Sequence, residues 1–284
     1  MTTPSQDAGA GAFGRDLTLR IASAAVLVPV ALAFAYLGGW PFLILCAFCA
    51  GGILWEWARL VAGGPDARIL GPGWVALLAA LALTGTNRPG FAITAVLIGA
   101  VFAGLAEATK SPVRPGWAAG GVIYAGVAFL GPALLRRDVE LGLPAFLFLC
   151  VTVWMTDIVA YLVGRGVGGP LLWPQVSPKK TWSGALGGLA GGIVGGTLVA
   201  YASGVGGLGA AIVALGLSAL SQAGDLFESA VKRRFGAKDT GRLIPGHGGL
   251  MDRLDSFVVA ALAAVLIGVL HGGTHAPARG LLEW

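Results

Sequence analysis

The chain has 284 residues, of which 56% are hydrophobic and 12% charged, and its net charge is +5. Soluble domains carry roughly 25% charged residues, so a chain this poor in charge cannot cover a surface that faces water. The composition excludes an ordinary cytosolic enzyme, a nucleic-acid-binding protein and a disordered chain, and it predicts an integral membrane protein.

Continuous apolar runs predict where the chain crosses the membrane. A helix needs about 20 apolar residues to span the hydrocarbon core. Nine segments approach or exceed that length: 20–38, 41–62, 73–87, 90–108, 117–135, 143–163, 183–202, 206–231 and 255–271. The runs do not alternate as the strands of a membrane barrel do. We therefore expect an all-α fold, a polytopic transmembrane helical bundle of about nine spans at 20–271, with a polar, disordered N-terminal tail at 1–19 and a short C-terminal tail at 272–284.

The distribution of basic residues predicts the orientation of these spans. With the N-terminus in the cytoplasm, fifteen of the nineteen Lys and Arg residues fall in cytoplasmic segments. The other four are Arg88, Arg136, Arg137 and Arg279, and they fall outside. Such a bias follows the positive-inside rule. We expect a cytoplasmic N-terminus and an external C-terminus.

Three acidic residues lie inside or at the ends of the first six spans. Charge inside a span is costly and by default marks a functional position. Glu56 is typical of an interfacial anchor and Glu107 of a solvated helix end. Asp157 lies deep in the sixth span, with Tyr161 and Arg165 following at four-residue intervals on the same helix face. This stripe either holds helices in register or lines a substrate cavity, and the sequence favours neither.

The loop before the seventh span is basic and rich in hydroxyl groups. It contains Ser177, Lys179, Lys180, Thr181 and Trp182 in close succession. Two lysines beside hydroxyls suit the phosphate of a lipid or of a nucleotide. The alternative is an ordinary positively charged cytoplasmic loop, which the orientation already explains.

Glycines dominate the seventh span. Two interleaved series with four-residue spacing comprise Gly184, Gly187, Gly188, Gly191, Gly192, Gly195 and Gly196. They predict a smooth face on which another helix packs, either in this chain or in a second subunit. A nucleotide-binding loop is disfavoured because no lysine follows in the P-loop pattern.

Acidic residues gather at the end of the eighth span and the start of the ninth. Asp225, Glu228 and Lys232 fall on one helix face, and Asp252 and Asp255 open the ninth span. Acids at a helix start also occur as simple caps that suit the helix dipole. The neighbouring acids and bases weaken that simpler interpretation.

The loop between these two spans adds cations and flexible glycines. It carries Lys238, Arg242 and His247, the last flanked by three glycines, and Arg253 follows. Glycine lets backbone N–H groups approach an anion closely. Carboxylates mixed with lysine and arginine suit a Mg²⁺–polyphosphate complex, because oxygen atoms hold the metal and cations hold the phosphates.

Residues 229–255 read SAVKRRFGAKDTGRLIPGHGGLMDRLD, with the pattern S-x-x-K-R, then K-D, then P-G-H-G-G, then D-R-x-D. This pattern closely resembles the signature of phosphatidate cytidylyltransferases, also called CDP-diacylglycerol synthases. Residues 224–226, 177–182 and 157–165 also look like elements of that family, so the likeness covers about 20–271. The sequence departs from the family at Ser183, where many relatives carry Glu, and we assign that position no catalytic role.

The resemblance implies a membrane-embedded nucleotidyltransferase of phospholipid biosynthesis that makes CDP-diacylglycerol and pyrophosphate from CTP and phosphatidate with Mg²⁺. The residues and the resemblance together assign catalysis to Asp225, Asp252, Lys232 and His247, metal ligation to Asp225, Asp252, Glu228 and Asp255, and substrate binding to Ser177, Lys179, Lys180, Thr181, Lys238, Arg242, Arg253, Asp157 and Tyr161.

The expected partners are CTP, phosphatidate drawn from the bilayer, and membrane lipids, without nucleic acid. The glycine faces and the resemblance also suggest a homodimer. A composition rich in Gly, Ala and Arg is typical of a GC-rich bacterial genome, which favours the plasma (inner) membrane with the active site on its cytoplasmic side.

Two rival functions use similar residues. A transporter would use Asp157, Asp225 and Glu228 as an ion relay, but the sequence shows no convincing inverted repeat and its charge is concentrated at one face. A CDP-alcohol phosphotransferase also uses clustered aspartates and Mg²⁺, but its usual aspartate spacing is absent.

Overall fold

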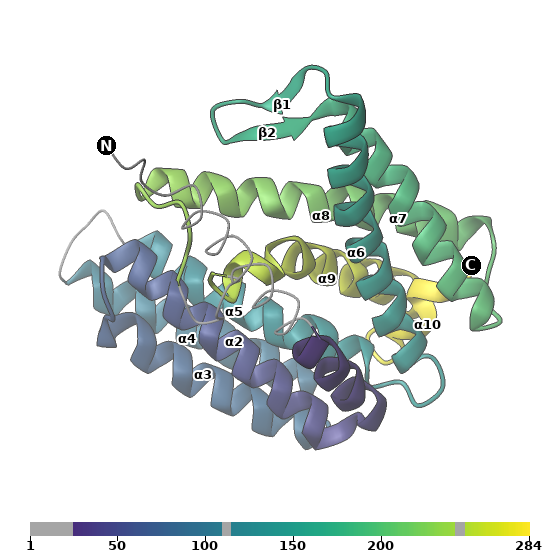
Figure 1. Ribbon diagram of the computed structural model, residues 1–284. Coiled ribbons are helices and arrows are strands. Elements are labelled where there is room, and N and C mark those ends of the chain that lie inside the picture. Colours follow the sequence, from purple (N-terminus) through teal and green to yellow (C-terminus); the bar gives the residue numbers. More distant parts are fainter. Residues whose placement is uncertain (1–24, 110–114, 242–247) are drawn as a thin grey trace, which may run out of the picture.

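The computed structural model describes residues 25–109, 115–241 and 248–284. Within these ranges, eight helices are long and apolar enough to cross a membrane: α2 (Gly39–Ala62), α3 (Ala67–Gly85), α4 (Pro89–Ala108), α5 (Pro115–Leu135), α6 (Gly142–Val167), α7 (Trp182–Ala202), α8 (Leu208–Arg234) and α9 (Met251–Gly272). The predicted polytopic helical bundle is confirmed (Figure 1). Before α2 lies a shorter apolar helix, Ala25–Leu37. The predicted span at 20–38 begins outside the described residues, so a ninth span stays a prediction.

Helix α3 begins earlier than the sequence predicts. It starts at Ala67 instead of residue 73, and the Asp66 carboxylate accepts a hydrogen bond from the Arg68 N–H at 3.0 Å. This is a helix N-cap, which satisfies one of the donors left free in the first turn. The apolar pattern missed the first turn because Arg68 and Pro72 interrupt it.

A two-stranded antiparallel hairpin joins α6 to α7, where the sequence predicts only a loop. It pairs β1 (Leu171–Trp173) with β2 (Ser177–Thr181), with Leu171 opposite Thr181. Figure 1 shows the hairpin standing clear of the helices beside the end of α6. Thr181 then caps α7, since its hydroxyl accepts a hydrogen bond from the Gly184 N–H at 3.1 Å.

The glycine face of α7 packs within this chain, which confirms it as a packing surface. A Cβ added at Gly188 would lie 3.0 Å from the Thr156 carbonyl of α6. A Cβ at Gly192 would lie 2.4 Å from the Thr156 hydroxyl and 2.7 Å from Ser218 of α8. The Thr156 and Ser218 hydroxyls are hydrogen bonded to each other at 2.7 Å. The small residues therefore bring three backbones close enough to share a buried polar contact.

The segment predicted as a C-terminal tail contains a helix, α10 (Pro277–Leu282). It packs against the end of α9, where a Cβ on Gly268 would lie 2.1 Å from the Pro277 carbonyl. The His271 ring stacks on Trp284 with centroids 4.1 Å apart. These contacts hold the chain end against the bundle.

The helices bring the two predicted groups of basic residues to opposite ends of the bundle. Arg137, which follows α5, donates to Asn87 between α3 and α4, and Arg279 of α10 forms a salt bridge with Asp138. Lys232 lies at the other end, where α8 ends and α9 begins. The basic residues predicted to lie outside are therefore separated in space from those predicted to lie in the cytoplasm.

Candidate active site

Asp252 lies in the first turn of α9 and has a full set of hydrogen-bond donors. Its Oδ1 accepts from the Lys232 Nζ at 2.7 Å. Its Oδ2 accepts from the Thr240 N–H, the Thr240 hydroxyl and the Gly249 N–H, each at 3.0 Å. These contacts tie the end of α8 and both described ends of the α8–α9 loop to one carboxylate. The positive end of the α9 dipole favours its negative charge further.

Glu56 of α2 joins the same network from a distant part of the sequence. Its two carboxylate oxygens accept from the Leu250 and Met251 N–H groups, both at 2.8 Å, and its Oε2 also accepts from the Thr240 hydroxyl at 2.9 Å. The side chain is 1% exposed. The prediction of an interfacial anchor is therefore wrong: Glu56 caps the start of α9.

Thr240 connects these two acids, and sequence reasoning assigned it no function. Its hydroxyl lies within hydrogen-bonding distance of both Glu56 and Asp252. A Cβ on Gly249 would lie 2.1 Å from that hydroxyl, so only glycine fits there. The sequence feature that could have indicated a role for Thr240 is its position beside a glycine, in a loop that contains both acidic and basic residues.

Lys232 bridges two acids that approach it from α8 and α9. Its Nζ lies 2.5 Å from the Glu228 Oε2 and 2.7 Å from the Asp252 Oδ1. Glu228 has a fully buried side chain, and within the described part of the chain neither of its oxygens has a partner with hydrogen-bond geometry. A buried carboxylate is costly unless its oxygens are satisfied. Lys232 provides the positive charge at Oε2, and Oε1 is the Glu228 oxygen left for a further cation.

The hairpin contributes a second ion pair. The Nζ of Lys180, on β2, lies 2.5 Å from the Asp225 Oδ2 of α8, and both side chains are 28% exposed. The other Asp225 oxygen accepts from the Ser229 hydroxyl at 3.3 Å. The hairpin thus brings Lys180 to the acid cluster, whereas Lys179 is exposed beside it.

Carboxylates from three helices lie within electrostatic range of one another beside this ion pair. Asp225 interacts electrostatically with both Asp157 of α6 and Asp255 of α9. Ser256 links the latter two, because its N–H donates to Asp255 at 2.7 Å and its side chain is hydrogen bonded to Asp157. Gly224 allows the approach, since a Cβ there would lie 2.7 Å from the Asp255 carbonyl. Asp157 therefore faces the predicted site.

The other predicted site residues have more peripheral positions. Tyr161 accepts a hydrogen bond from Arg165 at 2.7 Å, and both side chains are exposed. Ser177 begins β2, and Thr181 is occupied as the α7 cap. Lys238 and Arg253 have exposed side chains. Arg242 and His247 lie outside the described residues, so their roles stay predictions.

Glu107 differs from its prediction as a solvated helix end. It is fully buried at the end of α4, and neither of its oxygens has a hydrogen-bond partner in the described ranges. The prediction failed because the position is close to the end of an apolar run, where burial by neighbouring helices leaves no mark on the sequence.

The cluster offers the oxygen ligands that Mg²⁺ prefers, carboxylates above all. The Glu228 Oε1, which has no hydrogen-bond partner within the described ranges, is the oxygen that best fits a bound cation. In the described ranges, however, no three acidic, His or Cys side chains converge as a metal site. Lys180 and Lys232 instead neutralise Asp225 and Asp252. The carboxylates are the type of ligand that suits a divalent cation, and in this structure lysine ammonium groups provide the positive charge beside them.

An apolar groove of about 280 Å³ adjoins the acid cluster. It runs between α5, α8 and α9, and its lining includes Trp117, Tyr124, Phe227 and Leu262. Tyr124 is 8% exposed, its hydroxyl has no hydrogen-bond partner within the described ranges, and it lies within electrostatic range of Asp255. The groove is therefore an apolar, lipid-compatible surface, and Tyr124 in its wall lies within electrostatic range of the acid cluster.

Comparison with known proteins identifies the family. A model described as the cytidylyltransferase family matches residues 18–270. The chain is 41% identical over 267 residues to the phosphatidate cytidylyltransferase of Brucella suis biovar 1 (strain 1330). The aligned region covers 92% of this chain and 97% of that protein. It is 33% identical over 254 residues to the phosphatidate cytidylyltransferase of Bacillus subtilis (strain 168), and this aligned region covers 86% of this chain and 94% of that protein. The chain belongs to the cytidylyltransferase family.

Proposed function

We propose that this protein is a phosphatidate cytidylyltransferase, which converts CTP and phosphatidate to CDP-diacylglycerol and pyrophosphate in phospholipid biosynthesis. The observation that carries the proposal is the gathering of carboxylates and lysines from β2, α6, α8 and α9 beside an apolar groove. A reaction between a water-soluble triphosphate and a bilayer lipid needs both surfaces at one place. The names of the relatives support the same reaction.

The chemistry needs charge neutralisation more than a general base. A phosphate oxygen of phosphatidate attacks the α-phosphorus of CTP, a new P–O bond forms, and the bond to the β-phosphate oxygen breaks to release pyrophosphate. A phosphomonoester has its second pKa near 6, so the attacking group is largely dianionic at about pH 7. Lys180 and Lys232 supply the positive charge that lets this anion approach the triphosphate.

We assign Mg²⁺ binding to Asp225, Glu228, Asp252 and Asp255. When bound, the ion supplies positive charge to the triphosphate and to the departing pyrophosphate. The carboxylate donors support this assignment, among them the Glu228 Oε1, which has no hydrogen-bond partner within the described ranges. The two lysines paired with Asp225 and Asp252 would then be free to bind phosphate oxygens.

The lipid substrate reaches this centre sideways from the bilayer in our proposal. Its acyl chains lie in the groove between α5, α8 and α9, and its phosphate lies toward the acid cluster. Tyr124 stands between the two regions, with an unpartnered hydroxyl. A diacyl lipid phosphate matches this apolar groove beside cations, whereas a free sugar phosphate would leave the apolar wall uncovered.

We place the protein in the bacterial plasma membrane with a cytoplasmic N-terminus, an external C-terminus and a cytoplasmic active site. The positive-inside distribution supports this orientation, and the two ends of the bundle separate the basic residues accordingly. A homodimer stays a prediction.

A radiolabelled CTP assay on the purified full chain in vesicles tests the reaction. We expect labelled CDP-diacylglycerol and an equal amount of pyrophosphate with phosphatidate, and neither with diacylglycerol, which lacks the attacking phosphate. Ion flux across the vesicles without CTP consumption would support the rival transporter instead. Product formation with water-soluble alcohol phosphates but not with phosphatidate would also contradict the proposal.

A further inference from the structure

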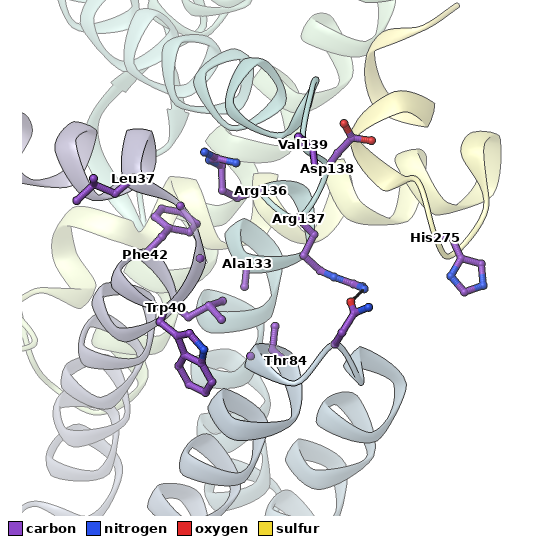
Figure 2. Close-up of a pocket in the computed structure, with 15 residues that line it drawn as sticks. Leu37, Trp40, Phe42, Thr84, Ala133, Arg136, Arg137, Asp138, Val139 and His275 are labelled. Atoms are coloured by element: carbon purple, nitrogen blue, oxygen red, sulfur yellow. Dashed lines mark hydrogen bonds between the residues drawn. The ribbon is translucent and has the colours of Figure 1, made fainter.

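A second cavity, of about 460 Å³, lies at the opposite end of the bundle from Asp252 (Figure 2). It is bounded by the end of the helix Ala25–Leu37, the start of α2, the end of α3 and the α5–α6 connection. Figure 2 shows apolar side chains of α2, including Trp40 and Phe42, on one side and Arg137 on the other. The cavity therefore combines an apolar wall with a polar, cationic wall, and the proposed reaction does not use it.

Two arginines give this cavity its charge. Arg136 donates to the Ala35 carbonyl at 2.7 Å and to the Tyr36 carbonyl at 3.1 Å. Arg137 donates to the Asn87 side-chain oxygen. All three acceptors are uncharged, and in the described ranges no carboxylate pairs with either arginine. Both guanidinium groups therefore keep donors and an unbalanced charge for an anion.

Asp138, the acid that also lines the cavity, is hydrogen bonded and ion paired to groups other than the two arginines. It accepts from the N–H groups of Leu141 and Glu140 at 2.8 and 2.9 Å and forms a salt bridge with Arg279 at 3.2 Å. Burial alone would raise the pKa of Asp138, but these hydrogen bonds and the Arg279 charge outweigh it, so the pKa lies below its ordinary value. Asp138 shares Arg279 with Glu140 and Glu283, and it forms no ion pair with either arginine of the cavity within the described ranges.

The cavity has a built shape and an unsatisfied polar group. Gly38 has φ +62°, and a Cβ there would lie 2.8 Å from the Arg136 guanidinium. A Cβ on Gly85 would lie 2.4 Å from the Trp40 ring. Thr84 is 5% exposed, and its hydroxyl has no hydrogen-bond partner within the described ranges. A buried polar group without a partner is costly, and here it lines the same cavity as the arginines.

We propose that this cavity binds the phosphate headgroup of an anionic phospholipid at the membrane surface opposite the proposed active site. The guanidinium fork of arginine suits phosphate oxygens, and the Thr84 hydroxyl can donate to the same group. The acyl chains continue along exposed apolar surface, since Tyr36 and Leu37 are 74% and 66% exposed. Trp40 at the start of α2 is typical of a side chain at the membrane–water boundary. A soluble anion would leave this apolar wall uncovered.

The test measures lipid binding by native mass spectrometry of the purified full chain with added phosphatidylglycerol or phosphatidylcholine. We compare Arg137→Gln with Arg88→Gln, because Arg88 is an exposed arginine at the same end of the bundle that does not line the cavity. Arg136 is left intact because it holds the Ala25–Leu37 helix through two carbonyls. Loss of one charged hydrogen bond should weaken phosphatidylglycerol binding roughly tenfold in Arg137→Gln only.

A second variant keeps the test independent of the folding of Arg137→Gln. Val139 lines the cavity and is 95% exposed, so Val139→Glu should fold and should also weaken phosphatidylglycerol binding by its negative charge. The proposal is supported if the unmodified chain binds phosphatidylglycerol more tightly than phosphatidylcholine and if both variants reduce this difference. Equal binding of the two lipids, unchanged binding in both variants, or equally strong binding of glycerol phosphate alone would overturn it.

Discussion

At the scale of single residues, two buried glutamates have opposite surroundings. Glu56 accepts three hydrogen bonds from the start of α9 and from Thr240, whereas Glu107 has no hydrogen-bond partner in the described ranges. Hydrogen bonds to a charged group contribute more than neutral ones, and an unpaired buried polar group costs free energy. The two residues should therefore respond in opposite ways when their charge is removed.

The change Glu56→Gln should lower the free energy of unfolding by about 1–3 kcal/mol, because an amide NH₂ group, which cannot accept a hydrogen bond, replaces one carboxylate oxygen. Glu107→Gln should leave the stability unchanged or raise it. Thermal unfolding of both purified variants in the same detergent measures the difference. Equal unfolding midpoints for Glu56→Gln and the unmodified chain would show that Glu56 does not hold α9.

The adjacent lysines of β2 provide a second test with a matched control. Lys180 contacts Asp225, whereas Lys179 is exposed. Lys180→Gln should lower turnover by roughly tenfold to a hundredfold, since each 1.4 kcal/mol of lost transition-state stabilisation is a factor of ten. Lys179→Gln should have a smaller effect on turnover. Steady-state rates at varied CTP and phosphatidate distinguish the two, and equal losses would mean that the loop acts only through its total charge.

At the scale of elements, the contact between α6, α7 and α8 depends on the absence of side chains at glycine positions. A Cβ at Gly192 would lie 2.4 Å from the Thr156 hydroxyl and 2.7 Å from Ser218. Gly216 of α8, by contrast, has nothing within 4 Å of an added Cβ. The same substitution therefore has opposite consequences at the two positions.

We expect Gly192→Ala to lower the free energy of unfolding by about 1–3 kcal/mol, the usual cost of overpacking a well-packed contact. Gly216→Ala should raise it by roughly 0.5–1 kcal/mol, because alanine is the better helix former. Thermal unfolding of the two variants side by side measures both signs. Destabilisation by Gly216→Ala together with a neutral Gly192→Ala would contradict the packing described for α7.

At the scale of the whole molecule, the orientation predicted by the basic residues has a direct check. Single cysteines at Lys179 and Lys238 should react with a membrane-impermeant reagent from the cytoplasmic side, whereas a cysteine at Val139 should react only from outside. All three positions are exposed, and Val139 lies at the other end of the bundle. Labelling of positions 179 and 238 only from outside would show that the protein has the opposite orientation in the membrane.

The sequence predicts the long helices well because each is a continuous apolar run. It also predicts that Asp225, Lys232 and Asp252 gather, because they lie in one motif at the ends of consecutive spans. Lys232 and Asp252 are in fact joined at 2.7 Å. The local pattern and the tertiary structure agree for Lys232 and Asp252, whereas Asp225 is paired with Lys180.

The missed features come from contacts between distant positions. The hydrogen bond between Glu56 and Thr240 joins residues 184 positions apart, and no local pattern records it. The β1–β2 hairpin is too short to show an alternating pattern, with strands of 3 and 5 residues. Burial of Glu107 depends on neighbouring helices in the same way.

The central claim is that the acid cluster at the α8–α9 junction transfers the cytidylyl group to phosphatidate. The most direct test compares Asp225→Asn with Asp239→Asn for CDP-diacylglycerol formation at saturating CTP and phosphatidate. Both changes remove one charge, but Asp225 lies in the cluster and Asp239 is an exposed acid of the following loop. We predict a loss of roughly 10²–10³-fold in turnover for Asp225→Asn, the usual effect of removing one electrostatic contact from a transition state, and near-normal turnover for Asp239→Asn. Unchanged turnover in a folded Asp225→Asn protein would contradict the account.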